Sequence, residues 1–159
     1  MMVDLLFLQA EHLKSLASYH LTDEQLVFTA HPLERCLSAI LSSNCKPVGI
    51  CKGKDIVGFF ILQWGDIRPY TYVEDALLLR AYSIQYPYQR QGFAKQSMNE
   101  LPVFVNRYFP DIRKVVLGVN YNNKLAQKVY LAAGFEDTGR RIQGQAGEQY
   151  VFKKDWKLE

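Results

Sequence analysis

The spacing of hydrophobic positions changes several times along the chain, and each spacing predicts a type of element. Apolar residues recur every three or four positions where a helix is expected, and they form short runs rich in β-branched residues where a strand is expected. In the first part of the chain, the pattern predicts a strand at 3–8, helical turns around 13–17, a helix at 32–41 and a hairpin of strands 47–52 and 56–64. After a polar aromatic loop at 65–74, it predicts a strand at 76–84, a helix at 94–108, a strand at 115–119 and a helix at 122–133. Closing strands are expected at 135–138 and 148–153, around a loop rich in Gly and Gln.

Four residues mark where these helices begin, bend or end. Thr22 and Gln25 match a capping box, in which each side chain pairs with the other residue's backbone at a helix start. Pro102 lies inside a helical pattern and, because it lacks a backbone donor, is expected to kink or interrupt that helix. Gly134 stands where a helix C-terminus favours a left-handed residue.

The order of the elements predicts an α/β fold, with a mixed sheet flanked by helices. Strand-to-helix crossovers follow residues 84 and 119. The chain has 159 residues, about the length of one domain, and contains no repeat, linker or low-complexity segment. These features predict a single domain over 1–159.

Composition narrows the class of protein. Hydrophobic residues make up 48% and charged residues 22%, which is typical of a soluble globular protein. The net charge of +3, from 19 Lys and Arg against 16 Asp and Glu, is too weak to favour nucleic acid as a partner. No apolar stretch reaches the roughly 20 residues that a bilayer requires, and the N-terminus lacks the features of a secretory signal. A cytoplasmic protein without a membrane partner is therefore predicted.

The junction between the strand at 76–84 and the following helix holds the first candidate site. Helix N-termini bind phosphate because their unpaired N–H groups and the helix dipole both favour anions. Gly92 and Ala94 carry little or no side chain, so a diphosphate can approach the backbone, and Arg90 and Lys95 add positive charge. The segment is neither a Walker-type loop nor a three-glycine dinucleotide fingerprint, and its spacing alone fits a purely structural junction equally well.

A second candidate site lies on the helix at 122–133. Asn123 and Tyr130 are seven residues apart, nearly two helical turns, so their side chains share one face. Ala126 lies between them and leaves room for a slender ligand, and Tyr130 is then a candidate acid. The alternative for Tyr130 is a half-buried packing role. Three apolar residues of this helix are expected to point toward the core: Leu125, Val129 and Ala132.

Together, the two segments resemble the GNAT superfamily of acetyl-CoA-dependent N-acetyltransferases. The first matches the family's pyrophosphate signature, Gln/Arg-x-x-Gly-x-Gly/Ala, as Gln89-x-x-Gly92-x-Ala94. The second is similar to another family motif, as Asn123-x-x-Ala126-x-x-x-Tyr130-x-x-x-Gly134-Phe135. The resemblance is strongest over 76–138, and it implies the GNAT fold, with a mostly antiparallel sheet that is splayed after the cofactor-binding strand and flanked by about four helices.

The resemblance also implies roles for individual residues. Acetyl-CoA would be the co-substrate, with no metal. The pantetheine arm would bond to the strand at Tyr82, Ser83 and Ile84. The pyrophosphate would be held, with Gln89, by backbone N–H groups at Arg90, Gln91, Gly92, Phe93, Ala94 and Lys95. Asn123 and Ala126 would adjoin the pantetheine or acetyl group, and Tyr130 would protonate the departing thiolate.

The chain departs from the family's pattern at the general base. Many relatives carry a Glu on or near the strand before the signature, whereas the strand at 76–84 contains no carboxylate. Glu74, just before this strand, and Glu148, at the start of the last one, are candidates, and a water chain would also serve. A solvated surface role is the alternative for each carboxylate.

The acceptor is expected to be a small amine or polyamine, and after these a peptide or protein amine. A further resemblance, through Val57-Gly58-Phe59-Phe60 and Arg80, is to a bacterial branch that includes spermine/spermidine acetyltransferases. A polycation would favour the acidic residues near the expected site, which are Asp66, Glu74, Asp75 and Glu148. Four arginines oppose it, namely Arg68, Arg80, Arg140 and Arg141. Five aromatic residues would suit an apolar amine: Trp64, Tyr70, Tyr72, Tyr86 and Tyr88.

Two other classes of protein stay open at this point. One is a family member that binds acyl-CoA without turnover, and the other is a small basic nucleic-acid binder. The two complete motifs disfavour the first, and the weak charge disfavours the second. A homodimer is compatible with the resemblance.

Overall fold

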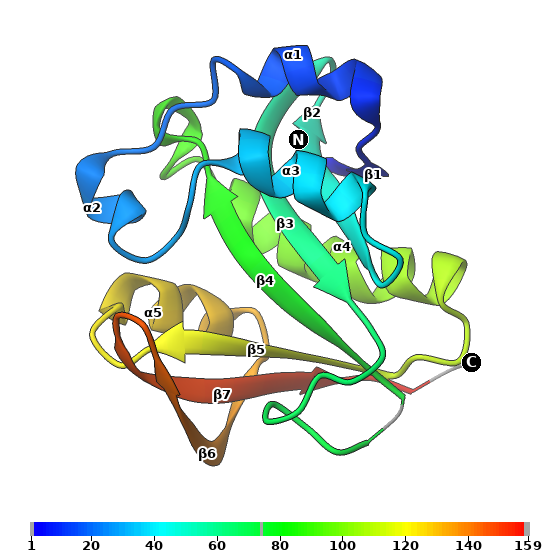
Figure 1. Ribbon diagram of the computed structural model, residues 1–159, viewed down its shortest axis with the longest axis vertical. Helices are drawn as coiled ribbons and strands as arrows, with labels where there is room; N and C mark the ends of the chain where they lie inside the picture. The colour runs from blue at the N-terminus through cyan, green and yellow to red at the C-terminus, as the bar shows by residue number, and fades with distance from the viewer. Residues whose placement is uncertain (1, 74, 158–159) are drawn as a thin grey trace.

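Seven strands pair into one sheet across residues 2–73 and 75–157, which are the residues that the computed structural model describes (Figure 1). Their order in the sheet is β1-β2-β3-β4-β5-β7-β6, and all neighbours are antiparallel except β4 and β5. The strands are β1 (Asp4–Phe7), β2 (Cys45–Lys52), β3 (Asp55–Gln63), β4 (Ala76–Ile84), β5 (Lys114–Asn120), β6 (Glu136–Gly144) and β7 (Gly147–Asp155). The predicted mixed, mostly antiparallel sheet is confirmed.

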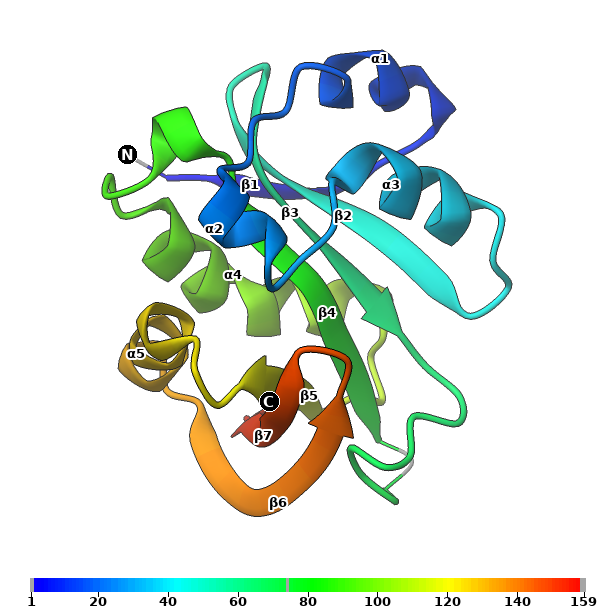
Figure 2. The same ribbon diagram turned by 60° about the vertical axis from the view of Figure 1, so that its left-hand side comes forward.

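Helices cover both faces of the sheet. In the described residues they are α1 (Leu13–Leu16), α2 (Asp23–Leu26), α3 (Pro32–Ile40), α4 (Phe93–Tyr108) and α5 (Lys124–Ala132), with single 3-10 turns η1 (Ala10–His12) and η2 (Tyr86–Tyr88). Figure 2 shows α3 and α4 on opposite sides of the sheet. We call these two sides the α3 face and the α4 face.

Side-chain alternation along β4 divides the core between these faces. Leu77, Leu79 and Ile84 pack on the α4 face, in a cluster that includes the buried residues of α4 and α5. Leu78 lies on the α3 face with Val116 of β5. Each strand therefore sends side chains to both sides, and β4 and β5 are covered by protein on both.

A bulge in β4 changes its course. Ala81 has a positive φ of 58°, and the pairing register with β3 shifts between Phe59 and Ile61. An extra residue in one strand bends that strand and strengthens its twist. The parallel pairing of β4 with β5 extends only from Ala76 to Leu78. The bulge thus lies just beyond the last residue at which β4 and β5 pair.

Helix α4 runs through Pro102 without interruption, so the expected break is wrong. Pro102 has no N–H to donate to the carbonyl of Met98, four residues earlier. Lys154 of β7 donates to that carbonyl instead, at 3.3 Å, and its ammonium also donates to the carbonyl of Ala133 at the end of α5, at 2.8 Å. Burial lowers the pKa of Lys154. A long-range contact therefore satisfies the group that the proline leaves unpaired.

Two further expectations are corrected by the structure. The Gly- and Gln-rich segment after Thr138 is mostly strand, because β6 continues to Gly144 and a tight turn joins it to β7. Helix α5 buries Tyr130 and Ala133, while Leu125 and Ala132 are exposed. Its buried face follows the aromatic residue of the second motif rather than the aliphatic ones. The capping box at Thr22, the start of α3 at Pro32 and the left-handed Gly134 are confirmed.

The two adjacent lysines of β7 provide a test of this packing. We expect Lys154→Met to lower the free energy of unfolding by about 1–3 kcal/mol, because it leaves the Met98 and Ala133 carbonyls without their donor. Lys153→Met is the matched control, since Lys153 pairs with the exposed Asp155, and it is expected to change stability by no more than about 0.5 kcal/mol. Urea denaturation measures both. Equal stability of the two variants would show that the bonds of Lys154 do not support the helices.

Candidate active site

An opening between β4 and β5 is the central feature of the site. Beyond Leu78 and Val116 the two strands no longer pair; β4 stays with β3 as far as Ile84, and β5 stays with β7 as far as Asn120. Figure 1 shows β4 and β5 close together at one end and separating toward the other. We call this opening the fork. Backbone groups of each strand that face the fork have no strand partner there, so an extended ligand can bond to them.

The three predicted cofactor residues of β4 lie on the wall of the fork. The Tyr82 hydroxyl lies 2.6 Å from the Ser97 hydroxyl of α4. Ser83 turns to the α3 face, where its hydroxyl lies 2.8 Å from that of Tyr19. The Ile84 carbonyl accepts from the Gln25 and Gln89 side chains at 3.0 and 3.1 Å. The Ser83 side chain and the Ile84 carbonyl are thus already engaged, which leaves the remaining backbone of the strand and the Tyr82 ring for a ligand.

The loop at the mouth of the fork has the geometry of an anion site. Arg90 and Gly92 both have positive φ, 62° and 85°, and Gly92 is the N-cap of α4. No side chain caps this helix start, so its first N–H groups are left for a ligand. Successive N–H groups around left-handed residues form concavities that bind anions. The exposed side chains of Arg90 and Lys95 lie in the same segment.

The side chains of the two glutamines in this segment bond to the protein backbone, and the predicted contacts of Gln89 and Gln91 with the cofactor stay predictions. Gln89 donates to the carbonyl of Ile84, and Gln91 donates to the carbonyl of Pro87 at 3.0 Å. The Gln89 amide therefore holds the loop to the end of β4, and the Gln91 amide bonds within the loop, to η2. An anion would meet the backbone N–H groups at 90–95, which we call the anion cradle. The bond of Gln89 fixes the position of this cradle.

Helix α5 forms the opposite wall. Asn123 is its N-cap, with the side-chain oxygen accepting from the Ala126 N–H at 3.2 Å. Tyr130 is 7% exposed, and its ring meets that of Tyr82 edge to face with centroids 5.9 Å apart. Among the described residues the Tyr130 hydroxyl has no hydrogen-bond partner. Burial, with a smaller contribution from Tyr82, raises the pKa of Tyr130, so this hydroxyl stays protonated at neutral pH.

Of the two candidate bases, the structure describes Glu148. Glu148 is exposed near the start of β7, opposite Gln143, and lies on the same side of that strand as Tyr150. Glu74 lies outside the described residues. Neither observation tests the role of a base, so both carboxylates stay predictions.

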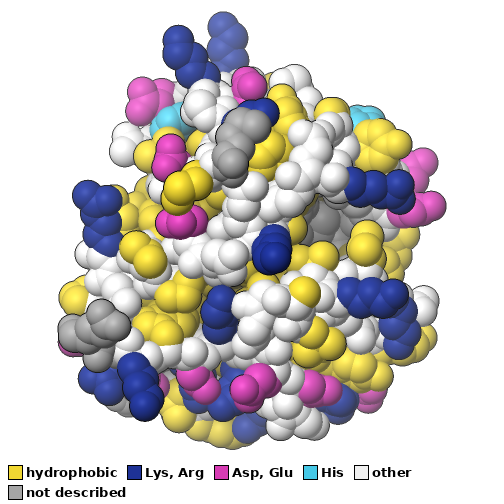
Figure 3. Space-filling view, turned by 180° about the vertical axis from the view of Figure 1, so that it is seen from behind, with side chains coloured by type: hydrophobic (Ala, Val, Ile, Leu, Met, Phe, Trp, Pro, Cys, Tyr) yellow, Lys and Arg dark blue, Asp and Glu magenta, His cyan; other side chains and the backbone are white. Residues whose placement is uncertain are grey.

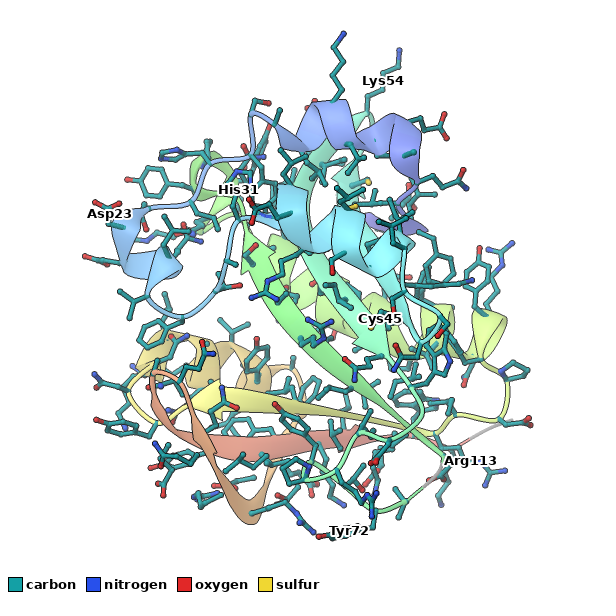
Figure 4. All side chains as sticks on the ribbon, viewed as in Figure 1. Asp23, His31, Cys45, Lys54, Tyr72 and Arg113 are labelled. Carbon is teal, nitrogen blue, oxygen red and sulfur yellow. The ribbon has the colours of Figure 1, made fainter. Side chains whose placement is uncertain are left out.

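The predicted aromatic residues do not form a single wall. Trp64 packs against Phe109 at 5.6 Å in the α4-face core, and Tyr88 packs edge-on against Phe93 at 6.3 Å. Tyr86 is exposed beside His20, and Tyr72 is 67% exposed under the Arg140 guanidinium. Figure 4 shows Tyr72 at the lower margin of the molecule. Among these five, Tyr70 is the residue that packs on the α3 face beside β5.

Sequence reasoning missed the residues that hold the fork in shape. Tyr19 donates to the Ser83 carbonyl at 3.0 Å across 64 positions of sequence, and Gln25 reaches the next carbonyl. Asn120, 6% exposed, accepts from the Asn122 N–H and donates to the carbonyl of Ala146 in the β6–β7 turn, both at 2.8 Å. The pair Asn120 and Asn122 is a local turn pattern that the sequence does contain. The bonds of Tyr19 and Gln25 to β4 have no local pattern.

Comparison with known proteins agrees with this geometry. No protein-family model matches the chain. An uncharacterized N-acetyltransferase of Bacillus subtilis, YbbJ, is 38% identical over 151 residues, which are 94% of each chain. The structure of AAC(6')-Ib with ribostamycin and coenzyme A aligns with TM-score 0.79 over 98% of this chain and 94% of that one, at 15% identity. Spermidine N-acetyltransferase from Vibrio cholerae, with CoA and spermine, aligns with TM-score 0.70 over 97% and 95%, at 15% identity.

A splayed sheet beside a helix start with no side-chain cap makes a place for an extended ligand that carries an anionic group, and the similarity to known proteins specifies the family. The chain belongs to the GNAT superfamily of acetyl-CoA-dependent N-acetyltransferases, as its similarity to YbbJ shows. The expected family is confirmed. In the described residues no cluster of His, Cys, Asp and Glu side chains could hold a metal ion, and no helix is long and apolar enough to cross a membrane.

Two glycines allow the anion cradle to be tested apart from stability. Gly92 at φ 85° and Gly53 at φ 60° are both left-handed, and a Cβ on either would meet nothing closer than 3.7 Å. Alanine at each position therefore strains the backbone to a similar extent. We expect Gly92→Ala to weaken CoA binding about tenfold, or about 1.4 kcal/mol, because the N–H groups shift, and Gly53→Ala in the β2–β3 turn to leave it unchanged. Titration calorimetry with CoA measures both, and equal affinities would argue against a cradle at Gly92.

Proposed function

We propose that this chain transfers the acetyl group of acetyl-CoA directly to a primary amine of a small molecule, with the coenzyme arm held in the fork. The observation that carries the proposal is the end of β4–β5 pairing at Leu78, next to a helix start whose N–H groups have no side-chain cap. The two features offer an extended arm and a diphosphate neighbouring places to bind. Family membership supplies the donor class.

Binding uses backbone more than side chains. The pantetheine arm lies along the unpaired half of β4 in the manner of an added strand, between Tyr82 on one wall and Asn123 and Ala126 on the other. The diphosphate sits on the N–H groups at 90–95, where the helix dipole and the two basic side chains favour negative charge. Such contacts fix the thioester in place, and positioning is a large part of the rate enhancement.

The reaction itself needs two proton movements. The acceptor first loses a proton to a base, because an ammonium has no free electron pair. The amine nitrogen then attacks the thioester carbonyl, the C–S bond breaks, and the nitrogen's remaining excess proton balances the negative charge on sulfur. In our proposal the Tyr130 hydroxyl hydrogen-bonds to the sulfur as this charge develops and relays that proton to it. Burial raises the pKa of Tyr130, so the hydroxyl is protonated when the sulfur charge develops, and the relay returns it to the neutral form.

The base and the acceptor are the open parts of the proposal. Glu74, Glu148 and a water chain remain the candidates for the base. Among the structural neighbours, AAC(6')-Ib was solved with ribostamycin and the Vibrio cholerae enzyme with spermine, so both small amines and polyamines are acceptors to test. A peptide or protein amine is the second choice. The cytoplasmic location and the homodimer expected from the sequence stay predictions.

The charge on the face that lies behind in Figure 1 gives no support to a nucleic-acid function. Figure 3 shows the molecule from behind, with Lys and Arg side chains interspersed with acidic and apolar ones. A protein that binds nucleic acid gathers its basic residues into a patch or stripe. On this face the described side chains form no such stripe.

Tyr130→Phe tests the chemistry. The ring keeps its contacts with Tyr82 and Phe135 but loses the hydroxyl, so we expect kcat to fall about 100-fold while KM for acetyl-CoA changes less than threefold. Tyr108→Phe, at the exposed end of α4, is the matched control and should keep wild-type kcat. The readout is thiol release from acetyl-CoA with a panel of small amines, polyamines and a lysine peptide. An unchanged kcat in Tyr130→Phe would remove it from the reaction, and CoA binding without thiol release for any amine would indicate a non-catalytic acyl-CoA-binding protein.

A further inference from the structure

Arg80 is the first side chain on the α3 face of β4 beyond the point where the fork opens. Leu78 forms the last pair with β5, and the next residue on the same face is Arg80. Ala81, with φ 58°, follows it at the bulge. The backbone of Arg80 therefore lies at the base of the fork. Its side chain is on the face opposite α4 and α5 and reaches over β3 to Gln63 and to Cys45 of β2.

The groups around Arg80 are neutral. Its Nε donates to the side-chain oxygen of Gln63 at 2.8 Å, and a terminal nitrogen lies 3.6 Å from the sulfur of Cys45. Figure 4 shows Cys45 below α3, beside the ends of β2 and β3. Burial raises the pKa of Tyr70, and the charge of Arg80 opposes that shift. Gln63, Cys45 and Tyr70 leave the guanidinium charge without compensation.

A half-buried arginine without a carboxylate is unusual. No described Asp or Glu lies within ion-pair distance of Arg80, whereas the exposed Arg68 and Arg141 each pair with an aspartate, at 2.7 and 2.8 Å. A guanidinium has five N–H donors in one plane, an arrangement that suits a carboxylate or a phosphate, and here two of these donors have partners. Burying a charge costs free energy unless it is paired, so the remaining donors point to an anionic ligand.

The neighbouring surface also carries basic side chains. A cavity of about 640 Å³ adjoins Tyr70 on the α3 face, and its lining includes three basic side chains and one acidic one, which are Lys114, Arg140, Lys153 and Asp137. Across the fork, β5 contributes Gly118, where a Cβ would lie 3.0 Å from the Tyr70 ring. The missing side chain at Gly118 lets Tyr70 lie against β5, beside the path to Arg80. Lys114 and Lys153 both lie near Asp155, at 3.8 and 2.8 Å, and the guanidinium of Arg140 lies over the Tyr72 ring. Among the described residues, Arg80 and Arg140 are therefore the basic groups of this region without a carboxylate partner.

We propose that Arg80 binds an anionic group of the acceptor, so that the substrate class is an amine that also carries a carboxylate or a phosphate. The inference rests on the proposed acetyl transfer and specifies its acceptor. The anion pairs with the free N–H groups of the guanidinium, which directs the amino group toward the thioester in the fork. The same positive charge repels polyamines and aminoglycosides, because a cation at the entrance raises the free energy of a bound polycation.

Matched acceptors test this preference. Leucine, leucinamide and isoamylamine differ in the carboxylate, and phosphoethanolamine and ethanolamine differ in the phosphate. Thiol release from acetyl-CoA is measured with each and with spermidine, and binding of each to the CoA-saturated protein is followed by thermal shift. We expect kcat/KM for leucine to exceed that for leucinamide and isoamylamine at least tenfold, or kcat/KM for phosphoethanolamine to exceed that for ethanolamine at least tenfold. The first result identifies a carboxylate as the preferred group, and the second identifies a phosphate. Turnover of spermidine or isoamylamine in preference to both anionic acceptors would overturn the inference while leaving the proposed transfer intact.

Variants of Arg80 separate recognition from folding. Arg80→Gln is expected to raise KM for the anionic acceptor at least tenfold, with KM for acetyl-CoA unchanged and the activity on isoamylamine equal or higher. Arg80→Lys keeps the charge but lacks the planar guanidinium, and it should raise KM for the anionic acceptor less than Arg80→Gln does. The control is Arg113→Gln, which should match the wild type. Arg113 is exposed, and Figure 4 shows it at the end where β4 and β5 pair, away from the opening of the fork. An equal loss of activity on all amines in Arg80→Gln, or no binding of either anionic acceptor to the CoA-loaded protein, would contradict a role in recognition.

Discussion

The end of hydrogen bonding between β4 and β5 after Leu78 is the constraint on which the site depends. Up to that residue the strands form an ordinary parallel pair. Beyond it the bulge at Ala81 bends β4 while β5 continues straight along β7. Backbone donors and acceptors inside a protein need partners, so an opening of this kind is stable only where a ligand or water supplies them. The fork is therefore the part of the sheet where an extended ligand can bond to the backbone, and it is the place proposed for the coenzyme.

Contacts from both faces of the sheet keep the fork open. On the α3 face, Tyr19 and Gln25 bond to the last two residues of β4 and hold that strand away from β5. On the α4 face, Lys154 joins the middle of α4 to the end of α5, which fixes the two helices that flank the fork. Because α4 begins at the proposed anion cradle and α5 carries Tyr130, the same contacts set the distance between the proposed cofactor site and the Tyr130 hydroxyl.

Local patterns in the sequence predicted the elements well and their contacts only in part. Gly92, Gly134 and the capping box of Thr22 were recognisable because each answers a local backbone requirement. The bulge at Ala81 was not, since alanine has no sequence signature for positive φ. Where α4 continues through Pro102, the unpaired Met98 carbonyl accepts from Lys154, which lies 52 positions after the proline in the sequence. Such long-range bonds decide which side chains the site receives, and periodicity does not contain them.

A crystal structure of the protein with coenzyme A tests the central claim most directly. The pantetheine arm is predicted to lie in the fork, bonded to the backbone of β4 beyond Leu78, with the diphosphate on the N–H groups at 90–95 and the thiol within hydrogen-bond distance of the Tyr130 hydroxyl. Coenzyme bound elsewhere, or strands β4 and β5 paired along their whole length in the complex, would contradict it.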